Sequence, residues 1–298
     1  MKKLLLLLDT DGKPSSFDQI AAYDAGVDHI LAYGGVSAAE VQNLVYGAMF
    51  TRGGGDLKNT AIFIGGSSVP PGEEVLKKTL GTFFGPVRVS VMFDANGCNT
   101  TAAAAVTRIA QTGDLAGKKA AVLAGTGPVG MRAALLLVRE GCEVRLTSRE
   151  LSRAQAATGM LKAQYGVEVH PAQVGSPADV VRVLEGVHLV LSCGGPGVRL
   201  LPQEVWQGLP DLRILADVNA VEPLGIQGIK VTDDGKEREG RRCFGAIGIG
   251  NLKMKVHREA VRRLFESNDL VLDVEEVHAI AKSLADPEKC GDLRAGQR

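Results

Sequence analysis

Short apolar runs alternate with amphipathic stretches along the amino-terminal part of the chain. The apolar runs are bounded by turn residues and are typical of buried strands, whereas the stretches between them repeat apolar positions at helical spacing. We expect strands at 3–8, 29–32, 60–64 and 87–93 and helices at 16–25, 38–51 and 73–83. Strands separated by helices indicate a mostly parallel sheet with right-handed crossovers, and therefore an α/β fold.

The same alternation resumes after a Thr- and Ala-rich segment, 100–111, which we expect to form a helix joining two domains. Strands are predicted at 119–123, 143–147, 167–170, 189–192 and 214–217, and helices at 129–140, 152–165, 253–265 and 274–284. The chain therefore divides into a first domain, 1–100, and a Rossmann-type parallel-sheet domain, 101–252. The last helices, within 253–285, are predicted to pack back on the first domain, and 286–298 is predicted to be a tail.

Composition and charge exclude several classes of function. The chain has 298 residues, with 34 Lys and Arg against 34 Asp and Glu, so its formal net charge is zero. A balanced surface gives no long-range attraction to nucleic acid or to an anionic membrane. Aromatic residues make up only 4%, which leaves few for stacking on single-stranded bases. We therefore expect neither a nucleic acid nor a membrane as a partner.

The amino terminus begins like a secretory signal but does not continue as one. Met1-Lys2-Lys3 precedes an apolar run, 4–8, and Asp9 ends that run well short of a signal's hydrophobic region. No stretch approaches the roughly 18 apolar residues that span a bilayer. The protein is expected to be soluble and cytoplasmic.

The cysteines do not form a metal-binding or redox pattern. None of the 5 cysteines falls into a C-x-x-C pair, so neither a zinc site nor a thioredoxin-like dithiol is expected. In a cytoplasmic protein they are predicted to be free thiols, mostly buried as small apolar groups. These residues are Cys98, Cys142, Cys193, Cys243 and Cys290.

A glycine loop gives the strongest functional signal. Gly125-Thr126-Gly127-Pro128-Val129-Gly130 directly follows the apolar strand 119–123 and opens the helix predicted at 129–140. In such a loop Gly125 turns the chain, Gly127 lets backbone approach a pyrophosphate, and Gly130 allows close packing of helix on strand. The alternative is an ordinary strand–turn–helix connection. The context predicts a dinucleotide cofactor whose phosphates rest on the helix amides.

The end of the next strand bears on which nicotinamide nucleotide is bound. A loop selective for NAD usually offers Asp or Glu to the ribose about 20 residues past the glycines. Here the strand ends in Ser148-Arg149-Glu150, where Ser148 can hydrogen-bond a 2′-phosphate and Arg149 can pair with it in bidentate fashion. Alternatively, Arg149 pairs with Glu150 on the surface, or Glu150 reaches a ribose. NADP is predicted to be preferred, with NAD also possible.

Two further loops are expected near the nicotinamide. Cys193 and Gly194 open a small-residue loop after the strand 189–192. Asn219 follows the strand 214–217, at the edge where open α/β sheets place ligand contacts. The Asn219 amide is predicted either to bond the nicotinamide or a ribose, or to form a turn.

No acid–base pair stands out on the substrate side. Each of the 5 histidines, at 29, 170, 188, 257 and 278, lies in an unrelated context and is predicted to be structural or exposed. Asp9, Asp11 and Asp18 cluster after the first strand. Segment 244–253 is expected to be a glycine-rich approach to a helix that carries Lys253 and Lys255. Because two helical positions differ by about 200°, both lysines cannot line one cleft.

The lack of a base suits one type of hydride transfer. When a hydride leaves a carbon between two nitrogens, lone-pair donation gives a stable amidinium and no proton needs to move. Such an enzyme supplies position, exclusion of water and a suitable field. A carboxylate such as Asp18 would stabilise the developing cation, whereas a lysine would orient the substrate.

Several long motifs resemble the NAD(P)-dependent methylene-tetrahydromethanopterin dehydrogenases. The resemblance runs from the amino terminus to about residue 284. It is carried by the glycine-loop stretch 122–132 and by the stretches 9–11, 14–18, 60–66, 96–104, 223–226 and 244–250.

The resemblance implies a substrate domain and a Rossmann domain, with a pterin site in the cleft between them. It also implies hydride transfer from a methylene-pterin to NAD(P), without a metal, in a homo-oligomer. By motif match Asp18 and Lys253 are the predicted catalytic residues. Asp11, Asn96, Thr100 and Lys255 are the predicted substrate-binding residues, and which of Lys253 and Lys255 faces the cleft stays open.

The chain departs from the family pattern in two places. It has Ser148-Arg149-Glu150 where NADP-using members have Gly-Arg-Lys, and Cys193-Gly194-Gly195-Pro196-Gly197 where Ala-Gly-Ala-Ile-Gly is expected. Two alternative functions stay open: a methylene-tetrahydrofolate dehydrogenase, and a non-catalytic sensor that binds NADP.

Overall fold

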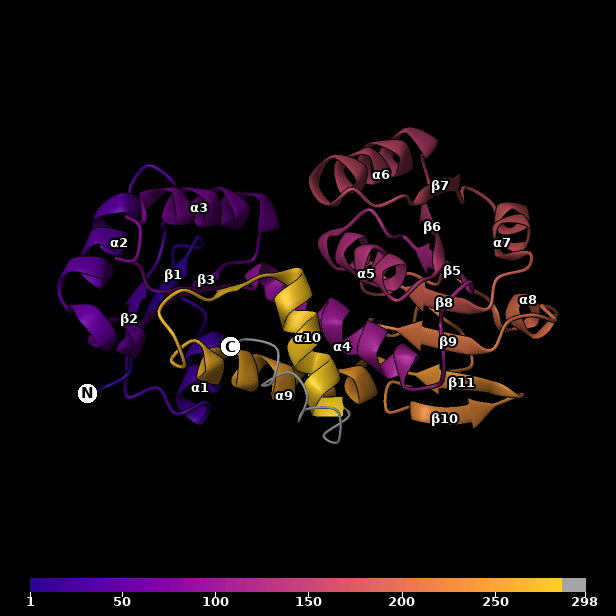
Figure 1. Cartoon of the computed structure of the whole chain (residues 1–298). Helices are drawn as coiled ribbons and strands as arrows, with labels where there is room; N and C mark the ends of the chain where they lie inside the picture. The colour runs from indigo at the N-terminus through magenta and orange to yellow at the C-terminus, as the bar shows by residue number, and fades with distance from the viewer. Residues whose placement is uncertain (286–298) are drawn as a thin grey trace. The chain divides into compact units, whose positions relative to one another are not determined.

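The computed structural model describes residues 1–285; the predicted tail, 286–298, and Cys290 lie outside the described residues. The chain forms two compact units (Figure 1). The N-terminal unit comprises Met1–Thr100 together with residues 254–285, and the central unit comprises Thr101–Lys253. Helices α4 (Cys98–Ala110) and α9 (Ala246–Arg263) carry the chain from one unit to the other.

The N-terminal unit is built on a five-stranded parallel sheet with the order β12-β4-β3-β1-β2. Its strands are β1 (Leu4–Asp9), β2 (His29–Tyr33), β3 (Thr60–Gly65), β4 (Ser90–Phe93) and β12 (Val271–Leu272). Its helices are α1 (Ser16–Asp24), α2 (Val41–Phe50), α3 (Val69–Thr82) and α10 (Val274–Ala285), with the short 3₁₀ helices η1 (Gly54–Asn59) and η2 (Ala95–Gly97). β3 is buried along its whole length, as expected when helices cover both faces of a parallel sheet.

The order in which the chain adds strands to this sheet reverses between β1 and β3. β1 pairs with β2 on one side and with β3 on the other, so the connections leaving β1 and β3 run in opposite directions. This is the switch point at which open α/β sheets bind ligands, next to the carboxyl ends of the strands. The β1–α1 and β3–α3 loops therefore lie where a substrate site is expected.

The central unit has a seven-stranded sheet with the order β10-β11-β9-β8-β5-β6-β7. The strands are β5 (Lys119–Leu123), β6 (Glu143–Ser148), β7 (His170–Gln173), β8 (Leu189–Ser192), β9 (Ile214–Asp217), β10 (Asp234–Arg238) and β11 (Arg241–Phe244). The helices that connect them are α5 (Pro128–Arg139), α6 (Leu151–Tyr165), α7 (Pro177–Leu184) and α8 (Gln203–Gln207). All pairs are parallel except β10 with β11, and the switch point lies between β5 and β8. The predicted α/β class and Rossmann-type sheet are confirmed.

Several predicted element bounds were wrong. The strand expected at 167–170 begins at His170, where pairing with Arg145 of β6 starts; Val167 and Val169 are buried in the connection that precedes it. The β10–β11 hairpin was missed because its sequence is rich in charged residues and lacks apolar alternation. Within the described residues, no helix is long and apolar enough to cross a membrane.

The glycine-rich segment 244–253 is the largest correction, because α9 already begins at Ala246. Its glycines are not an approach to the helix but allow the helix to pack tightly. A Cβ on Gly245 would lie 2.1 Å from the Lys230 carbonyl oxygen, and one on Gly248 would lie 2.1 Å from that of Asp233. A Cβ on Gly250 would meet no atom within 4 Å.

Because Gly248 is crowded and Gly250 is not, we expect alanine at these two positions of α9 to change the stability of the protein in opposite directions. Gly248→Ala should destabilise the protein by about 1–3 kcal/mol, because the added atom overpacks a contact with backbone that cannot rotate away. Gly250→Ala should stabilise it by about 0.5–1 kcal/mol, because alanine loses less backbone entropy in a helix. Urea unfolding of both variants measures this difference. Similar changes in both would contradict close packing at Gly248.

Candidate functional site

The glycine loop of the central unit is fixed to the neighbouring strand by its backbone. After β5, the Ala124 N–H donates to Thr147 Oγ1 at 3.0 Å and the Gly125 N–H donates to the Thr147 carbonyl at 2.9 Å. A Cβ on Gly125 would lie 2.9 Å from Leu146 Cγ, and one on Gly130 would lie 2.5 Å from the Gly125 carbonyl oxygen. Packing inside the protein thus requires glycine at both positions.

Gly127 differs from its two neighbours in the motif. A Cβ there would meet no atom of the protein within 4 Å, so packing alone does not require glycine. Gly127 is the N-cap of α5, Pro128 occupies the first turn, and no side chain caps this helix end. Amides at such an end favour an anion. An uncrowded glycine before a helix without a side-chain cap fits the pyrophosphate of a dinucleotide, with half-buried Thr126 and Val129 beside it.

The residues after β6 present a cation at the surface. Ser148 is buried, whereas Arg149 is exposed and its carbonyl accepts from Gln173 Nε2 at 3.0 Å. The nearest basic partner of Glu150 is Arg153, at 3.9 Å. In the part of the chain that the structure describes, no carboxylate pairs with the Arg149 guanidinium, so the alternative of an Arg149–Glu150 pair is wrong.

Cys193 begins the loop after β8 and is held by its backbone. Its N–H donates to the Leu123 carbonyl at 3.0 Å, which places the loop beside the end of β5. Burial raises the pKa of the Cys193 thiol, and the Asp217 carboxylate raises it further. A raised pKa disfavours the thiolate, which is the nucleophilic form of cysteine. The next residue, Gly194, leaves room for Leu200, whose Cδ1 would lie 2.7 Å from a Cβ there.

The loop after β9 is organised by a buried carboxylate. Burial raises the pKa of Asp217, even though its carboxylate accepts the Asn219 and Ile226 backbone N–H groups at 3.0 and 2.9 Å. The Asn219 amide donates to the Val221 carbonyl and accepts the Val221 N–H, both at 3.0 Å. Both the nitrogen and the oxygen of the side-chain amide thus make hydrogen bonds within the loop, as in the turn-forming alternative for Asn219.

In the N-terminal unit, two carboxylates organise the loops at the switch point. Asp9, at the end of β1, accepts the N–H groups of Asp11 and Ser15 at 2.9 and 2.8 Å. Asp11 accepts the Ser67 N–H at 3.0 Å and its hydroxyl at 2.9 Å. Asp11 was predicted to bind substrate, but its carboxylate here joins the β1 loop to the β3 loop.

Asp94 caps the start of α4. One of its oxygens accepts the N–H groups of Asn99 and Thr100 at 2.9 and 3.0 Å, and the other accepts the Thr100 hydroxyl at 2.6 Å. Thr100 is fully buried, and its hydroxyl supports Asp94. Asn96 is exposed on the same loop with a φ of 53°, a left-handed conformation that asparagine tolerates.

Asp18 lies in the first turn of α1, where its N–H donates to the N-cap Ser15 at 3.2 Å. Its side chain is 16% exposed and its Oδ1 lies 3.8 Å from Nε2 of His257. Nδ1 of the same ring lies 3.5 Å from Asp94 Oδ2. A fully buried imidazole thus lies between two carboxylates, packed on the rings of Phe17 and Phe63 at centroid distances of 6.0 and 5.5 Å.

His257 is the main residue that the sequence did not identify. Among the described residues, neither ring nitrogen makes a hydrogen bond, which is costly for a buried polar group. The sequence offered one indication of a role for His257, because it lies four residues after Lys253 and therefore on the same helical face. Lys253 is half-buried, whereas Lys255 is exposed, consistent with side chains that point in different directions.

Residues 1–285 contain no group of three or more His, Cys, Asp and Glu arranged to hold a metal ion. The central unit offers an anion-binding helix end, and the N-terminal unit offers a carboxylate supported by a buried histidine.

Comparison with known proteins gives the family of this chain. A family model described as methylene-tetrahydromethanopterin dehydrogenase, N-terminal, matches residues 16–96. The protein called bifunctional protein MdtA, from Methylorubrum extorquens, is 49% identical over 286 residues, 95% of this chain and 99% of that protein. An NAD(P)-dependent methylenetetrahydromethanopterin dehydrogenase from the same organism is 29% identical and spans 91% of this chain and 95% of its own.

Among solved structures, the ligand-free 5-ketofructose reductase of Gluconobacter sp. strain CHM43 aligns with a TM-score of 0.50 at 14% identity, over 95% of this chain and 99% of that one. This likeness shows the fold alone. The 49% identity over nearly the whole of both chains, together with the N-terminal family match, shows more. The chain belongs to the methylene-tetrahydromethanopterin dehydrogenase family.

Proposed function

We propose that the protein transfers a hydride from the methylene bridge of methylene-tetrahydromethanopterin to a nicotinamide nucleotide and releases the methenyl form. The observation that carries this proposal is the uncrowded Gly127 at the start of α5, within a chain of this family. A turn that served packing alone would not require glycine at position 127, whereas a bound pyrophosphate requires the free space beside its backbone.

The nucleotide site belongs to the central unit in this proposal. Backbone amides of 127–130 hold the pyrophosphate, and the bound nicotinamide supplies a carbon that accepts the hydride. Arg149, exposed and without a carboxylate partner among the described residues, is available for a 2′-phosphate, so NADP is the preferred form and NAD a weaker one. Cys193 remains a neutral thiol and lines the loop near the nicotinamide without reacting.

The pterin site belongs to the N-terminal unit, at the carboxyl ends of β1, β3 and β4. Asp18 is the negative group that stabilises positive charge as it forms on the methenyl carbon and its two nitrogens. His257 lies between Asp18 and Asp94, and Asp94 is itself fixed by amides of α4. Lys253 orients the substrate. No side chain has to remove a proton, because the cation is stabilised by its own nitrogen lone pairs.

The direct test combines purified protein, methylene-tetrahydromethanopterin and NADP. We expect NADPH and the methenyl pterin to appear together in a ratio of one to one, and NAD to support a slower reaction. Methylene-tetrahydrofolate is run in parallel, because turnover with it alone would make the protein a methylene-tetrahydrofolate dehydrogenase. NADP binding without turnover of either pterin would instead favour the sensor.

Arg149→Ala tests the proposed nucleotide preference. Removing charge-assisted hydrogen bonds to a 2′-phosphate should cost about 1.5–3 kcal/mol, a rise of roughly 10- to 100-fold in the KM for NADP. The KM for NAD should change little. Arg153→Ala is the matched control, since Arg153 is also exposed on the next helical turn but pairs with Glu150. Equal effects on the KM values for both nucleotides would show that Arg149 does not bind the 2′-phosphate.

Asp18→Asn tests the proposed electrostatic role. The neutral amide keeps the shape but lacks the charge, so kcat with the pterin should fall about 100-fold. The Kd for NADP, measured by fluorescence titration, should stay unchanged. Asp24→Asn, at the other end of α1 and paired with Arg258 at 3.7 Å, is the control and should retain activity. Weakened NADP binding in Asp18→Asn would refute the assignment of Asp18 to the pterin.

A further inference from the structure

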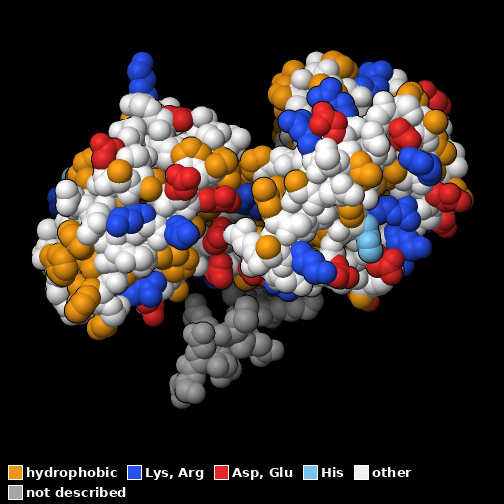
Figure 2. Space-filling model, turned by 90° about the horizontal axis from the view of Figure 1, so that it is seen from above, with side chains coloured by type: hydrophobic (Ala, Val, Ile, Leu, Met, Phe, Trp, Pro, Cys, Tyr) orange, Lys and Arg blue, Asp and Glu red, His pale blue; other side chains and the backbone are white. Residues whose placement is uncertain are grey.

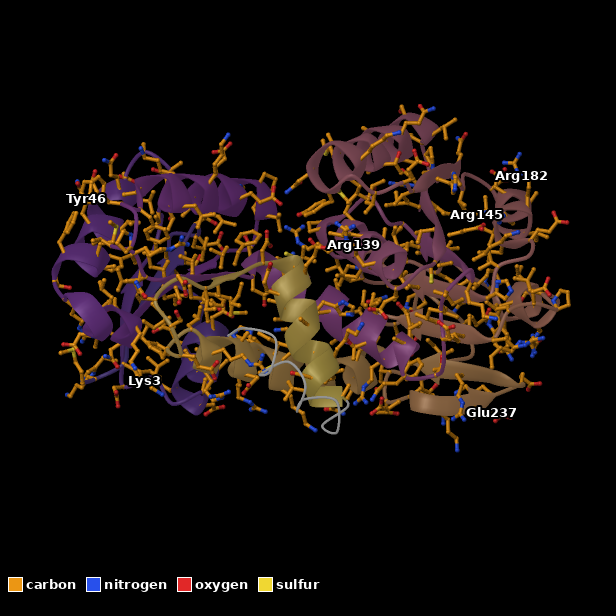
Figure 3. The ribbon with its side chains drawn as sticks, viewed as in Figure 1. Lys3, Tyr46, Arg139, Arg145, Arg182 and Glu237 are labelled. Atoms are coloured by element: carbon orange, nitrogen blue, oxygen red, sulfur yellow. The ribbon has the colours of Figure 1, made fainter. Side chains whose placement is uncertain are left out.

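A histidine of α9 lies between two carboxylates in the interior of the N-terminal unit, where side chains of the sheet and the helices fill the space (Figure 3). Nε2 of His257 lies 3.8 Å from Oδ1 of Asp18 on the neighbouring helix α1, and Nδ1 lies 3.5 Å from Oδ2 of Asp94 (Figure 1). On the face of this unit that Figure 2 shows, acidic side chains (red) reach the surface and no histidine (pale blue) does. The ring thus contacts its two carboxylates from inside the protein.

Aromatic side chains cover the faces of this ring. Phe17 and Phe63 pack on the imidazole at centroid distances of 6.0 and 5.5 Å, and the His257 side chain is 0% exposed. Among the described residues, the charged groups within 4.0 Å of the ring are Asp18 of α1 and Asp94 of the loop after β4. Because solvent does not reach the ring, its interactions with both carboxylates are screened little.

The carboxylate of Asp94 acts as a hydrogen-bond acceptor at both oxygens. Oδ1 accepts the N–H groups of Asn99 and Thr100, and Oδ2 accepts the Thr100 hydroxyl. Nδ1 of His257 therefore faces an accepting oxygen. An N–H at Nδ1 is attracted to this oxygen, whereas a lone pair there would be repelled by it. The geometry favours a hydrogen on Nδ1.

The same argument applies to Nε2, and there it rests on the proposed function, which requires a negative charge on Asp18. Nε2 faces Oδ1 of that carboxylate. A neutral imidazole has a hydrogen on one nitrogen and a lone pair on the other, so it would attract one of the two carboxylates and repel the other. An imidazole with a hydrogen on each nitrogen attracts both.

We propose that His257 carries a hydrogen on both ring nitrogens and is the positioning residue for Asp18. Hydrogen bonds of an active site are often long without substrate and shorten when it binds. With the pterin bound, the Nε2–H donates to Asp18 Oδ1 and fixes that oxygen, so that Oδ2 remains available to the forming cation. His257 acts through Asp18 and does not itself touch the substrate.

The charge of this arrangement suits the reaction. Two carboxylates and one imidazolium carry a single net negative charge, and the methenyl pterin carries a single positive charge. A field that is in place before the cation forms does not have to reorganise when the hydride leaves. Asp94, held by the first amides of α4, keeps the imidazolium in place, and the imidazolium in turn keeps Asp18 in place.

Nitrogen-15 NMR of the full chain, labelled at its histidines, tests the charge of the ring without any pterin. The His257 signals are those that disappear in His257→Gln. At neutral pH we expect both ring nitrogens of His257 to show the chemical shift of a protonated nitrogen. His188 supplies a reference, because its Nδ1 accepts the Lys119 N–H at 3.1 Å and therefore carries no hydrogen. A His257 nitrogen without a hydrogen would overturn the proposal, whether or not the protein turns over a pterin.

Kinetics of single and double variants test the positioning role. Glutamine at position 257 is polar but cannot donate to both carboxylates from one planar ring. In His257→Gln, kcat with the pterin should therefore fall roughly 10- to 100-fold, as expected when a reacting group is misplaced. The Kd for NADP should stay unchanged. In an Asp18→Asn background the same change should cost less than about 2-fold, because the carboxylate that His257 positions is already neutral.

His278→Gln is the matched control. His278 is the other buried histidine of the described residues, and this variant should keep the wild-type kcat. An unchanged kcat in His257→Gln, or a loss that persists in full in the Asp18→Asn background, would overturn the proposal.

Discussion

Both units depend on how backbone amides are satisfied where parallel strands end. At a switch point, loops leave the sheet in opposite directions and their N–H groups no longer have ladder partners. The N-terminal unit uses carboxylates for this purpose: Asp9, Asp11 and Asp94 each accept from amides of a neighbouring loop or helix. The central unit leaves the first turn of α5 without a side-chain cap, behind Gly127. The switch point of the N-terminal unit therefore carries negative charge, whereas the switch point of the central unit attracts an anion.

This difference accounts for the proposed division of chemistry. A developing cation is stabilised beside carboxylates whose position is fixed before the reaction begins, because the environment then need not reorganise. Asp18 is such a group, since its helix is capped by Ser15 and its oxygen faces a fully buried imidazole. Asp94 extends the support to α4, whose first amides it binds. In the proposed reaction, the carbon beside this fixed carboxylate loses a hydride and no proton, so no general base is needed.

The sequence predicted the features that depend on local patterns and missed those that depend on packing. Strands, the glycine loop and Arg149 follow from periodicity and spacing along short segments. His257 does not, because its ring meets Asp18 and Asp94 from parts of the chain far apart in sequence. The hydrogen bond from the Thr100 hydroxyl to Asp94 likewise depends on the folded loop and could not be predicted from the sequence. The start of α9 was missed because glycine is expected to end helices, whereas Gly245 and Gly248 serve contacts with distant carbonyls.

Within the N-terminal unit, the chain that leaves β2 contacts the β1 loop of the candidate pterin site. The chain leaving β2 donates two hydrogen bonds to the β1 loop, from Gly35 to the Asp11 carbonyl at 2.7 Å and from Val36 to that of Asp9 at 2.9 Å. A Cβ on Gly34 would lie 2.6 Å from the Gly12 carbonyl oxygen, so the two loops are in close contact. The β1 loop is thus bonded on one side by the chain that leaves β2 and on the other side by Ser67 of the β3 loop. Loops tied on both sides reorganise little, so the carboxylates they carry keep their positions when a charge develops nearby.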